Sequence, residues 1–154
     1  MNPYASYLGG LDPFEVITTM PARLEELIAG TDVDAAPAGK WNTRQILAHL
    51  ADTEIVFAFR LRQAVAERDH VIQPFDQDGW SAGYRTIDTA AALRLYSTVR
   101  GWNVAFLRGL PAEAFQKTLS HPERGPMTLQ TVLETMAGHD LNHVAQIERL
   151  HAAT

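Results

Sequence analysis

Apolar residues recur every three or four positions along four long stretches of the chain, and turn-forming residues separate these stretches. This spacing is typical of amphipathic helices, because residues three and four apart lie on one helical face. Over residues 43–67 the apolar positions with this spacing are Ile46, Leu47, Leu50, Phe57 and Leu61. No stretch shows the sustained alternation of a half-buried strand. The pattern predicts an all-α protein, folded as a four-helix bundle.

Residues that start and stop helices place the ends of these elements. The predicted helices cover residues 12–29, 43–67, 88–108 and 128–151. Asn42 or Thr43 is the expected N-cap of the second helix, and Thr128 that of the fourth. Gly30 follows the first helix as a C′ glycine. Pro21 lies within the first helix, so it either bends that helix or starts another in its first turn.

The connections differ in length and composition. Residues 69–85 are predicted to form a long loop, and loops of this length often carry function. Its aromatic residues, Phe75 and Trp80, either anchor the loop to the bundle or line a pocket. Residues 111–115 are predicted to form a short turn, and residues 121–126 an extended loop.

Composition excludes several classes of protein. The 154 residues include 18 acidic and 13 basic side chains, for a net charge of −5, and no cysteine. A nucleic-acid-binding domain needs a basic surface, which this composition does not offer. Without cysteine there is no disulfide, thiolate metal site or cysteine nucleophile. No apolar run has the length of a membrane span, and no signal peptide is recognisable. We expect a single cytoplasmic domain over residues 1–154.

Three histidines are candidates for metal ligands. His139 and His143 are four residues apart on the last predicted helix, so both imidazoles lie on one face and can bind one ion. His49 lies in an apolar part of the second predicted helix, where an imidazole needs a partner. Together they form a possible set of three histidine ligands, which leaves an open position on a tetrahedral ion. The alternative is that each is a core histidine with an ordinary hydrogen bond.

The other histidines and the familiar metal-binding motifs do not support a further metal site or another class of metalloenzyme. His70, His121 and His151 are expected to be solvated. The zinc-protease motif needs Glu after its first His, whereas Asp140 follows His139, so that class is excluded. A di-iron carboxylate bundle needs Glu three residues before a ligand His, and none of the three candidates has it.

Four short motifs together resemble the DinB/YfiT-like family. They lie at residues 41–44 (Trp-Asn-Thr-Arg), 49–54 (His-Leu-Ala-Asp-Thr-Glu), 76–80 (Asp-Gln-Asp-Gly-Trp) and 139–147 (His-Asp-Leu-Asn-His-Val-Ala-Gln-Ile). The similarity extends over residues 12–150. It implies a four-helix bundle with a divalent metal, usually zinc or nickel, on the matching histidines, His49, His139 and His143. Some members of the family are transferases or isomerases that use low-molecular-weight thiols such as mycothiol or bacillithiol, and many are homodimers.

The expected function is that of a metal-dependent enzyme acting on a small-molecule substrate. The metal would activate a small thiol or a water for attack on a small electrophile, as a transferase or hydrolase does. Asp52 and Gln146, with Glu54, are the nearest polar candidates for proton transfer or for orienting the ligands. Arg60, eleven residues after His49, is a candidate for holding an anionic group of the substrate.

Two alternatives stay open at this stage. Asp52 and Glu54 either serve the site or lie on an exposed face, where Arg60 or Arg62 would pair with them. The whole chain is either an enzyme or a non-catalytic, metal-stabilised interaction module. The homodimer is also expected from abundant apolar residues on the first and third predicted helices, namely Phe14, Ile17, Leu93 and Phe106.

Overall fold

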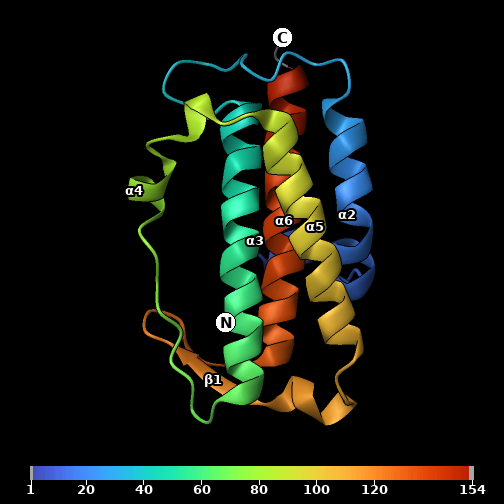
Figure 1. The fold of residues 1–154 in the computed structure, drawn as a ribbon, viewed down its shortest axis with the longest axis vertical. Helices are drawn as coiled ribbons and strands as arrows, with labels where there is room; N and C mark the ends of the chain where they lie inside the picture. Colours follow the sequence, from blue (N-terminus) through green and yellow to red (C-terminus); the bar gives the residue numbers. More distant parts are fainter. Residues whose placement is uncertain (1, 153–154) are drawn as a thin grey trace.

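Four long helices dominate the computed structural model, which describes residues 2–152 (Figure 1). They are α2 (Pro13–Ile28), α3 (Thr43–Ala66), α5 (Thr89–Arg108) and α6 (Leu129–Ala152). The shorter elements are α1 (Ala5–Leu8), α4 (Gln77–Ser81), η1 (Tyr84–Thr86), η2 (Ala112–Gln116), β1 (Thr118–His121) and β2 (Gly125–Thr128). The predicted all-α four-helix bundle is therefore confirmed. None of the helices in residues 2–152 has the length and hydropathy needed to cross a membrane.

The order of the helices around the bundle is unusual. Helix α2 packs against α5 and α6, and α3 packs against the same two helices. Consecutive helices α2 and α3 therefore lie across the bundle from each other, as do α5 and α6. Figure 1 shows α3 and α5 starting at the same end of the molecule, so these neighbours are parallel. This order makes α3 and α6 adjacent, although they are far apart in sequence.

The parallel α3–α5 pair explains the long connection between them. Helix α3 has 24 residues and is about 36 Å long, and the chain must return over that length before α5 begins. Residues 67–88 run back beside α3 (Figure 1). The prediction of a plain loop over residues 69–85 is wrong in detail, because the segment contains α4 and η1. Asp76 starts α4 by accepting the Gly79 N–H at 3.0 Å.

The two aromatic residues of this segment pack against each other, and one of them also contacts the bundle. The Phe75 and Trp80 ring centroids are 4.9 Å apart, and the Arg60 guanidinium of α3 lies 5.9 Å from the Phe75 centroid. Trp80 remains 44% exposed. Phe75 thus links the segment to α3, and Trp80 packs on it from outside.

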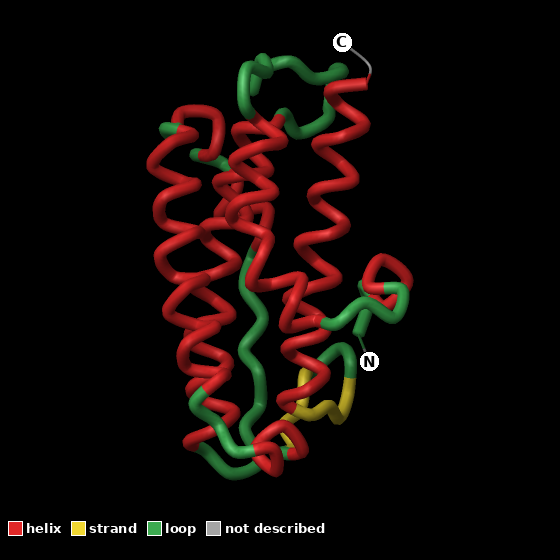
Figure 2. Tube along the Cα trace, turned by 90° about the vertical axis from the view of Figure 1, so that its right-hand side faces the viewer, coloured by secondary structure: helices red, strands yellow, loops and turns green. Residues whose placement is uncertain are grey.

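A hairpin replaces the extended loop predicted at residues 121–126. Strands β1 and β2 are antiparallel, with Leu119 opposite Met127, and both of these side chains are buried. Each strand has only four residues, too few for the alternation to stand out in the sequence. The turn predicted at residues 111–115 is the 3₁₀ helix η2. Figure 2 shows the hairpin beside the lower part of α6, on the side where α1 also lies.

The expected helix ends are confirmed to within about one residue. Asn42 caps α3 through a capping box with Gln45, in which each side chain bonds the other residue's backbone N–H. Thr128 accepts the Thr131 N–H at the start of α6, and Gly30 has a φ of 72° after α2. Pro21 lies inside one continuous helix, so of the two alternatives the structure excludes a second helix starting there.

The apolar residues expected to support a homodimer belong to the core of this chain. Ile17 is fully buried, and Phe14, Leu93 and Phe106 pack against the core cluster. Ile17 offers no surface to a second copy, and the other three are half-buried in the core, so these residues give little support for a dimer. The most exposed large apolar side chains are instead Phe59 on α3 and Trp102 on α5, at 63% and 68%.

Candidate metal centre

Adjacent helices α3 and α6 bring the three predicted histidines together. His49 comes from α3, and His139 and His143 come from successive turns of α6. The Nε2 atom of His139 lies 3.1 Å from the Nε2 atom of His49 and 3.1 Å from that of His143. All three side chains are buried, and their ring nitrogens form a group that is close enough to hold one ion.

The hydrogen bonds of these rings fit a cation better than a histidine cluster alone. The Nδ1 atom of His143 donates to Gln146 Oε1 at 2.7 Å, which leaves a lone pair on Nε2. His139 Nε2 then faces two other Nε2 atoms, and one neutral ring cannot donate a proton to both. Tetrahedral zinc with Zn–N bonds of about 2.0–2.1 Å would place its ligand nitrogens about 3.3 Å apart. The observed separations are close to that value, so the donor set fits a divalent ion.

Burial keeps two of these imidazoles, those of His49 and His143, in the form that binds metal. Removal from water lowers the pKa of His49 to about 3, with a smaller contribution from neighbouring His139. Burial also lowers the pKa of His143 well below its usual range, and His139 and His49 add to that effect. A neutral imidazole offers a lone pair, whereas a protonated one does not. At neutral pH, His49 and His143 are therefore ready to bind a cation.

Aromatic side chains surround the histidines. The Trp41 ring centroid lies 5.3 Å from that of His49, and Phe57 lies 6.1 Å from His139. Tyr4 packs edge-on against His139 with centroids 5.3 Å apart. Gly138 makes this last contact possible, because a Cβ atom there would lie 2.6 Å from the Tyr4 carbonyl oxygen. Walls of this kind limit water and strengthen electrostatic interactions at the centre.

A buried ionic network lies behind His139. Asp140 Oδ2 accepts hydrogen bonds from Arg100 at 2.6 Å and from the Tyr96 hydroxyl at 2.9 Å. Arg100 also donates to Glu54 Oε2 at 2.6 Å, and Arg100, Glu54 and Asp140 are each 1% exposed. The second oxygen of Asp140 is 3.8 Å from His139 Nδ1, so it acts on that ring by charge.

The charges around Asp140 decide its protonation. Burial alone would raise the pKa of the Asp140 carboxyl, but the Arg100 guanidinium and the neighbouring His139 together bring it down to about 2. Asp140 is therefore an anion at neutral pH. Its negative charge beside Nδ1 favours a proton on that nitrogen and a free lone pair on His139 Nε2.

For the acidic residues of α3, the alternative of an exposed face paired with Arg60 or Arg62 is wrong. Glu54 is buried and pairs with Arg100 and Asn103, rather than with Arg60 or Arg62. Asp52 is half-buried and accepts a hydrogen bond from the Tyr84 hydroxyl at 2.8 Å. Tyr84 lies between Asp52 and the three histidines, since its ring centroid is also 6.5 Å from that of His49.

The other predicted residues take different places. Gln146 directly contacts His143, as described above. Arg60 lies about 16 Å along the axis of α3 from His49 and donates to the Gln73 carbonyl at 3.2 Å. Burial lowers the pKa of Arg60 to about 10, and Arg124 adds to the shift. Arg60 and Arg124 line a small cavity below the three histidines, together with Phe57 and Thr135.

The remaining histidines were predicted to be solvated, and this is wrong for His70 and His121. His70 and His121 are 8% and 5% exposed, and His70 bonds Glu67 at 2.6 Å. His151 is half-buried, with Nε2 3.4 Å from the Thr43 hydroxyl. Contacts with the hairpin and between helix ends bury them, and such contacts leave no local mark in the sequence.

Sequence reasoning missed Arg100, Tyr96 and Gly138. Tyr96 and Arg100 are four residues apart, so Arg100 follows the apolar face of its helix, and a cation at such a position signals a buried partner. Gly138 lies in the interior of a helix directly before a candidate ligand. Glycine is costly there unless another part of the chain approaches closely, which is what Tyr4 does.

Comparison with known proteins agrees with this architecture. A Bacillus subtilis protein, YfiT, is 29% identical over 143 residues, which cover 88% of this chain and 80% of YfiT. A relative from Oceanobacillus iheyensis is 30% identical over 114 residues, covering 73% of this chain and 66% of its own length. The names of both assign them a metal-dependent hydrolase activity.

Solved structures give the same result. The structure of YfiT matches with a TM-score of 0.85 at 27% identity, over 92% of this chain and 85% of that one. Its description assigns it metal-dependent hydrolase activity and an unusual four-helix bundle topology. The mycothiol-dependent maleylpyruvate isomerase shares the fold, with a TM-score of 0.67 at 12% identity, over 88% of this chain and 59% of that one. Residues 16–147 match the profile of the DinB superfamily, and the chain belongs to that superfamily.

Proposed function

We propose that the protein binds one divalent metal ion through His49, His139 and His143 and is a metal-dependent enzyme. The observation that carries the proposal is that the buried Nε2 atom of His139 lies 3.1 Å from the Nε2 atoms of both His49 and His143, an arrangement that one proton cannot satisfy. Three protein ligands leave a coordination position open, as in catalytic sites, whereas structural zinc usually has four. The names of the relatives give independent support.

The reaction we propose is attack of an activated water or small thiol on a small electrophilic substrate. A bound divalent ion supplies a Lewis acid that brings the pKa of water to about 7 or holds a thiolate. Gln146 keeps the proton of His143 on Nδ1, and Asp140 does the same for His139 by charge. Because the chain has no cysteine, a nucleophilic thiol would have to be a separate low-molecular-weight molecule.

Asp52 and Arg60 have more distant roles in this proposal. Asp52 acts through Tyr84, whose hydroxyl it holds and whose ring lies near both His49 and Trp41. Arg60 offers a positive charge below the metal centre, and its buried Nε has no hydrogen-bond partner. It is therefore placed to hold an anionic group of a substrate that reaches the small cavity lined by Arg60, Phe57 and Thr135.

The remaining features of the proposal concern the ion and the setting. Neutral imidazole ligands suit zinc or nickel, and we propose one of these as the physiological metal. We also propose a cytoplasmic homodimer. Light scattering tests the dimer, and a mass of a single chain at micromolar concentration would contradict it.

Metal analysis tests the proposed site. Protein purified without an affinity tag that binds nickel should contain about one equivalent of a divalent metal. His49→Ala should lose most of that metal, because His49 is the ligand from α3. His151→Ala is the matched control, since it removes a histidine that lies outside the group. Stoichiometric metal of unchanged affinity in His49→Ala would refute the site.

An activity panel separates the enzyme from the interaction module. Metal-loaded protein is assayed with small esters and amides for hydrolysis, and with small thiols and electrophiles for transfer. We expect turnover in at least one set, lost both on metal removal and in His49→Ala. Tight metal binding without turnover in either set would favour the non-catalytic module.

A further inference from the structure

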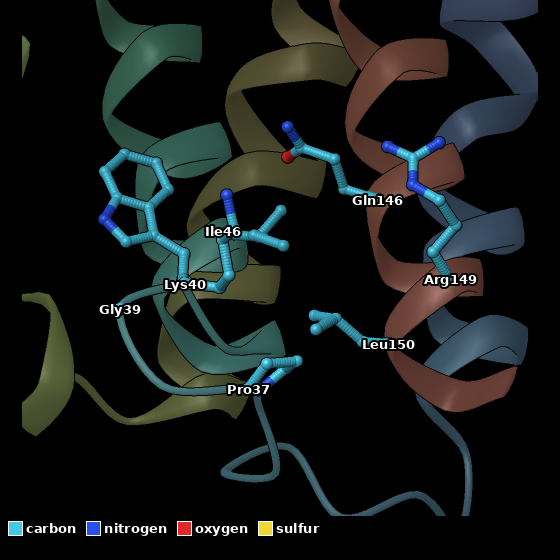
Figure 3. A pocket seen from close by; sticks show the side chains of 8 residues that line it. Pro37, Gly39, Lys40, Ile46, Gln146, Arg149 and Leu150 are labelled. Atoms are coloured by element: carbon cyan, nitrogen blue, oxygen red, sulfur yellow. The ribbon is translucent and has the colours of Figure 1, made fainter. Parts of the chain in front are cut away.

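A cavity of about 430 Å³ lies at the end of the bundle where α3 begins and α6 ends (Figure 3). The loop between α2 and α3 forms one side of it, and the last turns of α6 form the other. Its lining residues are Pro37, Gly39, Lys40, Trp41, Ile46, Gln146, Arg149 and Leu150. The volume falls within the range of about 300–1,000 Å³ typical of small-molecule sites.

The lining of this cavity is apolar with two positive charges. Trp41, Ile46 and Leu150 supply apolar surface, and Figure 3 shows Lys40 and Arg149 on opposite sides of one space. No acidic side chain lines the cavity, although the chain as a whole has a net charge of −5. Within residues 2–152, neither cation forms an ion pair or a side-chain hydrogen bond. Both charges are therefore available to an anion.

The loop that carries Lys40 is held in place. Nearby Arg44 binds Asp34 through two hydrogen bonds of 2.8 Å and donates to the Ile87 carbonyl at 2.9 Å. These contacts join Asp34 of the loop to the start of α3 and connect both to the segment that precedes α5. They also neutralise Arg44, which leaves Lys40 as the unpaired cation of this loop.

Two lining residues connect the cavity to the histidines. Gln146 accepts the Nδ1 proton of His143 at 2.7 Å and lines the cavity as well. Trp41 packs on the His49 ring with centroids 5.3 Å apart. A molecule in the cavity would therefore touch one residue that orients a metal ligand and one that covers another.

We propose that this cavity binds a small organic anion, with its carboxylate or phosphate at Lys40 and Arg149 and its apolar part against Trp41 and Leu150. The further step, that this anion is a substrate of the metal centre, rests on the proposed function. Binding itself does not, because the cavity and its charges belong to the protein alone.

Calorimetry on metal-free protein tests the binding. The probes are phenylacetate and phenyl phosphate, with neutral phenylacetamide as the isosteric control. We expect saturable binding of at least one anion, and at least tenfold weaker binding of the amide. The double variant Lys40→Met/Arg149→Met should weaken anion binding by at least tenfold. The control double variant Arg68→Met/Arg85→Met removes the same amount of charge from exposed positions elsewhere. It should leave anion binding unchanged.

Several results would overturn the assignment. They are the absence of saturable binding, equal binding of the amide, and equal losses in the two double variants. A loss in Arg60→Met without one in Lys40→Met/Arg149→Met would place the anion in the lower cavity instead.

Cobalt-substituted protein tests the link to the metal. Through Gln146 and His143, a bound anion should change the visible absorption of cobalt, and Gln146→Ala should reduce that change. If anions bind without altering the spectrum, the substrate assignment is wrong. If the protein takes up no cobalt, the proposed function fails, and calorimetry on metal-free protein still decides the cavity.

Discussion

Replacement of Arg100 by Met should strongly destabilise the fold. The Arg100 guanidinium is 1% exposed and lies 2.6 Å from both Glu54 Oε2 and Asp140 Oδ2. Methionine fills much of the same volume but leaves two carboxylates buried without their cation. Removing one partner of a buried ion pair costs about 3–5 kcal/mol of unfolding free energy. At about 2–4 °C per kcal/mol for a chain of this size, Tm should fall by roughly 6–20 °C.

The exposed pair between Arg23 and Glu148 provides the matched control. It also joins two helices, at 3.1 Å, but its side chains are 47% and 50% exposed. Water screens such a pair, so Arg23→Met should cost no more than about 1 kcal/mol. Both variants replace the arginine of an Arg–Glu pair by methionine, so they differ mainly in how deeply the pair is buried.

Urea and thermal unfolding of metal-free protein at pH 7 measure both variants. Glu54→Gln added to Arg100→Met should recover part of the loss, because it removes one of the uncompensated charges. The loss from Arg100→Met should also shrink toward pH 5, where the stranded carboxyls take up protons. Equal unfolding free energies for Arg100→Met and Arg23→Met would refute the reasoning, and would mean that the buried network contributes no more than a surface pair.

Three further predictions concern the metal centre. Saturating zinc should raise the unfolding free energy by about 2.7 kcal/mol at 100 times Kd, and the rise should vanish in His49→Ala; thermal shifts measure both. Metal-free protein should lose stability as the pH falls from about 6.5 toward 3. Over this range His49 binds a proton in the unfolded chain but not in the folded one, where its pKa is about 3. Urea titrations should show a flatter dependence in His49→Ala, and an unchanged slope would contradict the shift. Gly138→Ala should push Tyr4 away from His139 and cost about 1–3 kcal/mol, and equal stability with unchanged proteolysis of the N-terminal segment would refute that contact.

The helix ends could be predicted because they depend on neighbouring residues. The Asn42–Gln45 capping box and Gly30 act within a few positions, so the sequence displays them directly. The pairing of His139 with His143 is local for the same reason. The addition of His49 depended on adjacency between α3 and α6, which periodicity alone does not determine.

The residues whose surroundings were not predicted are those whose partners lie far away in the sequence. His121 of the hairpin and Arg60 of α3 line one small cavity, and two four-residue strands leave too weak an alternation to predict that hairpin. Sequence spacing left open a pairing of Glu54 with arginines of its own helix, because such spacings favour ion pairs. Its actual partner, Arg100, comes from α5 and is available only because α3 and α5 are parallel neighbours.

The helix order also accounts for the surroundings of the metal centre. Because consecutive helices lie across the bundle, the chain needs two long connections, over residues 29–42 and 67–88. The first supplies Trp41 and the second supplies Tyr84, and these rings contact each other at 5.9 Å above His49. A bundle with short hairpin connections would place α3 beside α2 and would have neither aromatic residue at this position. The topology that brings His49 to α6 therefore also provides the two segments that cover His49, and the first of them forms one wall of the neighbouring cavity.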